Sequence, residues 1–373
     1  MKKKLICFFL LIAMSSWFAT IAGAQDKPPE LSLDTGEEIY KAACIGCHGP
    51  GGKGQPESTL GFEKPSQFPD FSDCNGSNRE ETFDWRATIH EGGPGRGWSP
   101  IMPSFAQALT LQQIDKVTQY LRSLCTEPKW PLGEMNLPRA IATEKAFPED
   151  EWVLTTAVNA NGGGSVDGEL VYERRFGVRN QLEFAAPYGV LQRDNKSWVG
   201  GVGDLTLGYK RVLFASHHSI FSLQGEIAAP TGNRVQGLGS GVTTFTTFAA
   251  FGQRLSPTSF FQIQTGADLP VNTAKAPQAF FFHTAVGRTF AQTQGFGRIW
   301  TPMVEFLLDR DLVTAARTNW DLLPEMQVSL NKRHHVRASF GVRTPLNNTA
   351  GRSTQLVGYI LWDWFDGGFR EGW

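Results

Sequence analysis

The chain lacks the features that mark several large classes of protein. Its 35 basic and 36 acidic residues give a formal net charge of −1, so no basic surface indicates a nucleic-acid partner. Only five of its 373 residues are cysteines. No apolar run reaches the ~20 residues that a membrane-spanning helix requires. Function therefore has to be inferred from short motifs and from periodicity.

The longest apolar run lies at the N-terminus. Three lysines after Met1 precede the run from Leu5 to Ala19, which is followed by Ala22-Gly23-Ala24. This order predicts a secretory signal peptide at residues 1–24, cleaved after Ala24. The alternative is a retained membrane anchor, but the run is too short to span a bilayer and no cysteine directly follows the cleavage site to carry a lipid.

A C-x-x-C-H motif is the most informative short sequence in the chain, and it reads Cys44-Ile45-Gly46-Cys47-His48. Two thiols at this spacing can bond the two vinyl groups of one haem while the imidazole binds its iron. A redox dithiol or half of a zinc site would also contain C-x-x-C, but no second C-x-x-C or H-x-x-x-H lies nearby. The motif predicts one covalently attached haem c held by Cys44, Cys47 and His48.

A second axial ligand is expected downstream of the motif. Met102, in Ile101-Met102-Pro103-Ser104-Phe105, lies in a stretch that resembles the axial methionine loop of small monohaem cytochromes c. Two alternatives stay open: a thioether packed in the core, and His90 as the ligand. Ligation by methionine and histidine would raise the reduction potential of the iron.

Helical signals surround these two motifs. Thr35 and Glu38 form a capping box, as do Thr110 and Gln113, and each box precedes apolar residues at helical spacing. This pair of helices is similar to the N-helix and C-helix of a small cytochrome c. The resemblance covers residues 25–130 and implies an all-α cytochrome c domain.

Two further cysteines remain after the leader and the haem motif are assigned. In an oxidising compartment, Cys74 and Cys125 are predicted to form one disulfide.

From residue 151 to residue 373 the apolar residues recur at every second position, after a proline-containing linker at 131–150. The strands of a soluble β-sandwich would show the same alternation, so the loops between the strands have to distinguish a sandwich from a membrane barrel. About twelve strands are joined by short turns at one end and longer loops at the other, which is typical of an antiparallel outer-membrane β-barrel. Both ends of the barrel then lie on the short-turn, periplasmic side, next to the exported haem domain.

The C-terminal region also resembles outer-membrane transporters of the phenol-degradation type, through the stretches 202–210, 230–233 and 237–241. The whole layout resembles fused cytochrome-porins. The resemblance implies a protein in the outer membrane of a Gram-negative bacterium with its cytochrome domain on the periplasmic side.

Polar residues on the inward face of the strands do not decide whether the lumen is open or closed. They are of mixed sign, so they form either a closed network of paired charges or a polar path for a small solute. The set is Glu173, Glu183, Gln224, Glu226, Gln262, Gln264, Asp268, Glu305, Glu325, Arg337 and Arg343. The histidines at the short turns, His217, His218, His334 and His335, are expected to be solvated.

Three functions compete on this basis. The first is an outer-membrane-anchored electron carrier, not an enzyme, that exchanges electrons with a periplasmic or extracellular redox partner. The second is a channel or transporter for a small molecule with an accessory haem domain. The third is an enzyme that oxidises an external donor such as ferrous iron, for which no acidic metal-binding cluster is visible in the loops.

Overall fold

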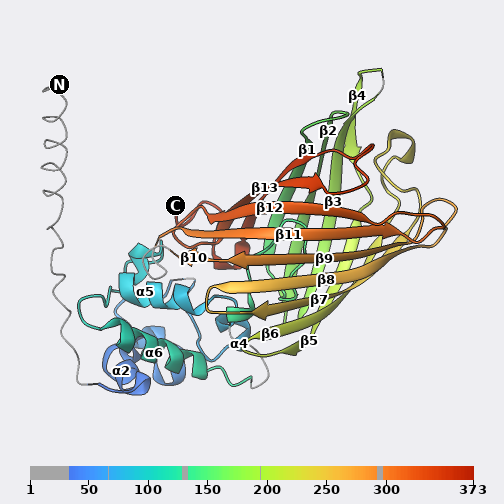
Figure 1. Ribbon diagram of the computed structural model, residues 1–373. Helices are drawn as coiled ribbons and strands as arrows, with labels where there is room; N and C mark the ends of the chain where they lie inside the picture. Colours follow the sequence, from blue (N-terminus) through green and yellow to red (C-terminus); the bar gives the residue numbers. More distant parts are fainter. Residues whose placement is uncertain (1–32, 66, 128–132, 194, 292–296) are drawn as a thin grey trace, which may run out of the picture.

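A small helical domain precedes a closed antiparallel β-barrel (Figure 1). The computed structural model describes residues 33–65, 67–127, 133–193, 195–291 and 297–373. The predicted fold class is confirmed. The predicted signal peptide, residues 1–24, lies outside the described residues. Among the residues described, none of the helices has both the length and the apolarity of a transmembrane span.

The helical domain is built around two capped helices that cross. Both predicted capping boxes are present, with Thr35 and Glu38 at the first helix and Thr110 and Gln113 at the last. A Cβ atom on Gly36 would overlap the backbone of the last helix, so glycine permits the close crossing. The helices are α2 (Gly36–Ala43), α3 (Ile45–His48), α4 (Cys74–Ser77), α5 (Thr82–Gly95) and α6 (Leu111–Ser123), with 3-10 turns η1 (Pro50–Gly52) and η2 (Glu57–Thr59).

Twelve of the described strands form the ring of the barrel, which closes where β9 pairs with β11 and β14 with β1. The ring strands are β1 (Glu151–Asn159), β2 (Ser165–Phe176), β3 (Asn180–Gln192), β5 (Thr206–Ala215), β6 (Ser219–Ala228), β7 (Thr244–Arg254), β8 (Ser259–Pro270), β9 (Ala279–Arg288), β11 (Ile299–Asp311), β12 (Asn319–Ser329), β13 (Val336–Pro345) and β14 (Gln355–Asp363). Two short strands, β4 (Trp198–Val202) and β10 (Phe290–Ala291), pair with β3 and β11.

The outward face of the ring is apolar, as a strand in contact with lipid requires. Large hydrophobic side chains between 37% and 58% exposed alternate with buried residues around the ring. They include Leu154, Leu170, Phe184, Leu207, Leu223, Phe245, Val286, Phe306, Met326, Phe340, Leu356 and Ile360. A water-soluble barrel would not present this many apolar side chains on its outer surface, so the ring has the surface of a transmembrane barrel.

Aromatic side chains near the strand ends do not all face outward. Trp300 is 45% exposed, but Tyr359 is 4% exposed and points into the barrel. Its hydroxyl donates a hydrogen bond of 2.6 Å to the carbonyl of Arg139, so Tyr359 holds the chain around Arg139 inside the barrel. Its neighbour Ile360, 48% exposed, takes the outward position that alternation requires.

The described part of the predicted linker, residues 133–150, lies inside the barrel and contacts inward-facing residues of the wall. Met135 and Phe147, 0% and 1% exposed, belong to one hydrophobic cluster with inward residues of β5 to β11. The backbone N–H groups of Ala142 and Thr143 donate to the carboxylate of Glu305. Gln262 on β8 donates to a backbone carbonyl of the same segment at 2.9 Å. We call residues 133–150 the luminal segment.

Charged side chains of the luminal segment are paired with the wall. Arg139 reaches Glu151 at 2.6 Å, Glu173 at 2.9 Å and Glu144 at 2.8 Å. Lys145 pairs with Glu149 at 2.6 Å. Of the inward polar residues, Glu173 is thus paired with the luminal segment, and Glu305 and Glu325 accept hydrogen bonds from it.

Candidate haem site

The C-x-x-C-H motif forms a single tight turn directly after helix α2. Cys44 caps α2, and its carbonyl accepts hydrogen bonds from the N–H groups of Cys47 at 3.2 Å and His48 at 2.9 Å. This geometry places both thiols and the imidazole on one short helical turn, α3. Both cysteines are free thiols, with Cys44 partly buried and Cys47 exposed, so a ring lying against the turn could reach both.

Glycines after the motif allow the chain to fold back under the histidine. Gly49 has φ +70°, and its carbonyl accepts a hydrogen bond of 2.6 Å from the hydroxyl of the buried Tyr40. The N–H of Gly54 then donates to the carbonyl of His48 at 2.7 Å. The motif is therefore held from both sides by backbone hydrogen bonds.

Two phenylalanines enclose the imidazole. Phe68 stacks on His48 with ring centroids 5.1 Å apart, and Phe71 lies tilted against it at the same distance. Burial lowers the pKa of His48 to about 4, which keeps the imidazole in the neutral form that binds iron. Its Nδ1 is buried and has no hydrogen-bond partner among the described residues. A neutral imidazole between two free thiols and the aromatic rings fits an iron ligand beside two thioether attachment points, so the residues present fit the group that the motif implies.

The loop of Met102 is anchored to the end of helix α5. The carbonyl of Met102 accepts a hydrogen bond of 3.0 Å from the N–H of Gly93, and the N–H of Phe105 donates to the carbonyl of Ile89 at 3.1 Å. Met102 packs against the same hydrophobic cluster as Cys44. His90, the alternative ligand, has its Nδ1 2.8 Å from the carboxylate of Glu91. Cys44, Cys47, His48 and Met102 stay the predicted residues for holding the haem.

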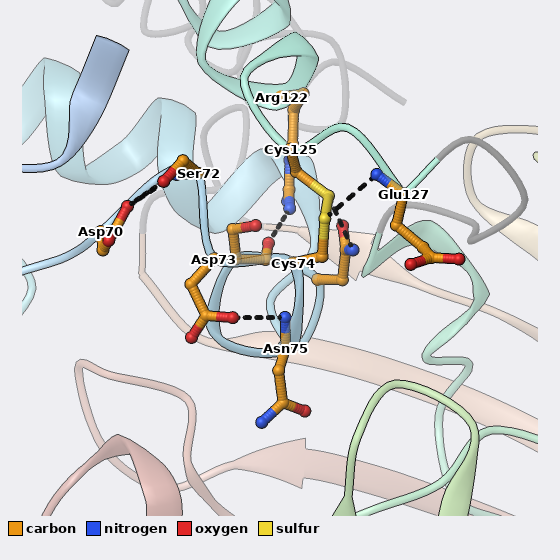
Figure 2. Close-up of a disulfide and its surroundings, with 10 residues drawn as sticks. Asp70, Ser72, Asp73, Cys74, Asn75, Arg122, Cys125 and Glu127 are labelled. Carbon is orange, nitrogen blue, oxygen red and sulfur yellow. Dashed lines mark hydrogen bonds between the residues drawn. A yellow bond between two sulfur atoms is a disulfide. The ribbon is translucent and has the colours of Figure 1, made fainter. Parts of the chain in front are cut away.

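The remaining cysteines join the middle of this domain to its last helix. A disulfide links Cys74 in α4 to Cys125 just after α6, with their Cα atoms 5.1 Å apart (Figure 2). Beside it, Arg122 donates to the carbonyl of Ser77, and its guanidinium lies 3.9 Å from the ring centroid of Trp85. Trp85 in turn contacts Phe71 at 5.2 Å. The disulfide region therefore supports the aromatic packing around the axial histidine.

The helical domain is docked on the short-turn end of the barrel (Figure 1). Arg333, in the turn between β12 and β13, donates to the carbonyl of Gly97 at 2.6 Å and stacks over the ring of Trp98 at 3.9 Å. Arg79 of the helical domain pairs with Asp150 at 3.0 Å. These contacts place the helical domain at the short-turn mouth of the barrel.

A second set of docking contacts is buried. Asp84 lies 2.9 Å from Nδ1 of His334 and forms an ion pair with Arg96, and all three residues are less than 5% exposed. Burial alone raises the pKa of Asp84, but Arg96 and His334 bring it down to about 2. The expectation that His334 and His335 are solvated is wrong, because the docked helical domain and the C-terminal residues cover this turn; each is 1% exposed.

Residues 33–125 match the family model described as cytochrome c. The N-terminal domain is a cytochrome c domain. This assignment agrees with the capped helix pair, the C-x-x-C-H turn and the anchored methionine loop, and it implies a haem cofactor.

The barrel is similar in outline to solved outer-membrane proteins. The KdgM porin covers 57% of this chain and 98% of its own, with 7% identity and a TM-score of 0.38. The NanC porin covers 56% and 97%, with 6% identity and a TM-score of 0.40. The COG4313 outer membrane channel from Pseudomonas putida F1 covers 61% and 99%, with 13% identity and a TM-score of 0.39. No curated protein matches the chain. The barrel assignment rests on the strand pairing described above.

Sequence reasoning missed the residues that brace the site. Phe68 and Phe71 occur in the stretch Phe68-Pro69-Asp70-Phe71, whose two aromatics in a proline-containing loop were the available signal. Asp84 and Arg96 gave no signal, because their partner His334 is separated from them by more than two hundred positions.

Proposed function

We propose that the protein is an outer-membrane electron carrier that holds one covalently attached haem at the periplasmic mouth of its barrel. The observation that carries the proposal is the luminal segment, which lies inside the barrel and is bonded to its wall. With the luminal segment hydrogen-bonded to Glu305, Glu325 and Gln264 on the wall, the barrel has the character of an anchor.

The arrangement of the two ends of the barrel supports a periplasmic position of the cytochrome domain. In bacterial outer-membrane barrels the short turns face the periplasm. The cytochrome domain docks on that end through Arg333 and His334, and it precedes β1, which also starts there. A chain with a secretory leader would deliver its haem domain to the same compartment.

The number of haem motifs supports exchange at one face. The sequence contains a single C-x-x-C-H, and the apolar band of an outer-membrane barrel is ~25 Å tall. A haem bound at the mouth would exchange electrons with a partner on its own side. When bound, the haem supplies an iron that accepts and releases one electron, and the protein supplies Cys44 and Cys47 for attachment with His48 and Met102 as ligands. Outer-sphere transfer needs no catalytic acid or base, so we propose a carrier and not an enzyme.

The test combines a redox measurement with a flux measurement. Purified full-length protein should contain six-coordinate haem that exchanges electrons with a soluble periplasmic cytochrome. A variant with Cys44→Ser and Cys47→Ser should lose haem staining on a denaturing gel and lose exchange, while its barrel still assembles. Wild-type protein in liposomes should pass no small solute. Solute flux that is equal in the wild type and the double variant would show a channel instead and refute the proposal.

A further inference from the structure

A groove on the outside of the barrel lies beside the cytochrome domain. Its cavity measures about 600 Å³ and sits where β14, β1 and β2 begin or end at the short-turn side. Trp152 pairs with both Trp362 and Tyr172 in strand register, and the rings of Trp152 and Tyr172 lie 4.6 Å apart. The aromatic lining is completed by Trp364 and Phe365, and the polar lining by Gln67.

The groove lies at the border of the apolar band. Two positions further along the same strands, Leu154 and Ile360 face outward with 44% and 48% exposure. Aromatic side chains at such a border sit at the level of the lipid head groups. A molecule dissolved in the bilayer therefore has direct access to the groove from the side.

The wall opposite the barrel comes from the haem domain. Gln67 lines the groove, and the next residue, Phe68, is the ring that stacks on His48 at 5.1 Å. The loop that closes the groove is thus the loop that packs against the axial ligand. A ligand held against Gln67 would be separated from the predicted haem ligand His48 only by Gln67 and Phe68.

The lining selects for a neutral, planar ligand. None of the lining residues is charged, so a phospholipid head group would find no ion pair there. Indole and phenol rings pack well against another flat ring, and the Gln67 amide can donate a hydrogen bond to an oxygen on it. An apolar tail on the same ligand could lie along Leu154 and Ile360 in the bilayer.

We propose that this groove binds a lipid-soluble p-quinone and its hydroquinone, and that the hydroquinone is the electron donor to the haem. The inference rests on the proposed function as a carrier. Oxidation of one hydroquinone to the quinone releases two protons to water and two electrons. The electrons reduce ferric haem to ferrous haem one at a time, and the soluble cytochrome of the proposed function removes the first before the second is transferred.

Binding can be measured without electron transfer. Haem-loaded full-length protein in nanodiscs is titrated with oxidised decylubiquinone while tryptophan fluorescence is recorded. The wild type should show saturable quenching. Trp152→Leu removes a stacking ring and should raise the dissociation constant about fivefold to tenfold. Gln67→Leu, on the exposed loop of the haem domain, should raise the dissociation constant about fivefold, because the hydrogen bond to the ligand is lost.

Trp300→Leu is the matched control. Trp300 is also an outward tryptophan at the short-turn end, 45% exposed, but it lies on β11 and does not line the groove. Its replacement should leave the dissociation constant unchanged. Quenching that does not saturate, or that has the same midpoint in all four proteins, would overturn the inference. Electron exchange with the soluble cytochrome, measured in the same preparations, tests the carrier function separately. If exchange occurs but no quinone binds, the quinone site is refuted and the carrier function is not.

Discussion

Replacing Arg139 by methionine tests whether the luminal segment is held by charge pairing. Methionine keeps much of the side-chain volume but removes the guanidinium. In the wild type this group contacts Glu151 at 2.6 Å and Glu173 at 2.9 Å, and both carboxylates are 0% exposed. The variant therefore leaves Glu173 without its closest cationic partner and Glu151 with only Lys145, whose Nζ lies 3.9 Å away.

The expected loss of stability follows from that burial. Removing one partner of a buried ion pair costs about 3–5 kcal/mol, because the remaining charge stays in a poorly solvating environment. Adding Glu173→Gln to the Arg139→Met variant should recover part of the loss, on the order of 1–3 kcal/mol, since one of the orphaned charges is then removed.

Urea unfolding in detergent micelles measures these differences, with tryptophan fluorescence as the signal. Arg343→Met is a suitable control, because Arg343 is 34% exposed and its partner Asp321 keeps a second ion pair with Arg352. It should cost no more than about 1 kcal/mol. If Arg139→Met unfolds at the same urea concentration as the wild type, the luminal segment is not held by these pairs.

Three other changes probe the haem domain. Met102→Ala should abolish the weak near-infrared charge-transfer band of the ferric protein and lower its reduction potential; a band that persists would exclude Met102 as the ligand. Arg96 and His334 hold the pKa of Asp84 below its ordinary value of 3.8, so these contacts stabilise the folded protein at neutral pH, and that stabilisation is lost as the pH falls below about 4. Asp84→Asn should remove this acid dependence from the urea midpoint, and an unchanged pH profile would contradict it. Replacing Cys74 and Cys125 by alanine opens a loop with a sequence separation of 51 and should destabilise the cytochrome domain by up to about 4 kcal/mol, read from urea unfolding of the haem absorbance.

Local patterns were enough to predict the two domains. The capping boxes at Thr35 and Thr110 mark helix starts because their hydrogen bonds are formed within four residues. The strands could be located because one face of each meets lipid and the other meets the interior, which forces an alternation of period two. These signals depend only on neighbouring residues.

Long-range pairing could not be predicted in the same way. Pro138 and Pro148 discourage α-helix, but nothing local shows that this stretch is buried. Its burial depends on Glu305, Gln262 and Tyr359, which come from strands far along the chain. The burial of His334 likewise depends on Asp84 in the other domain.

The position of the luminal segment constrains how the protein is made. Its residues precede β1 in the chain, yet the ring closes around them through the pairing of β1 with β14. We expect the segment to be in place before the first and last strands join, so that the strands wrap it as a template. A cytochrome domain already folded at the mouth of the barrel would hold the near end of that template during closure. Biogenesis of the barrel and maturation of the cytochrome are therefore expected to be ordered events on one polypeptide.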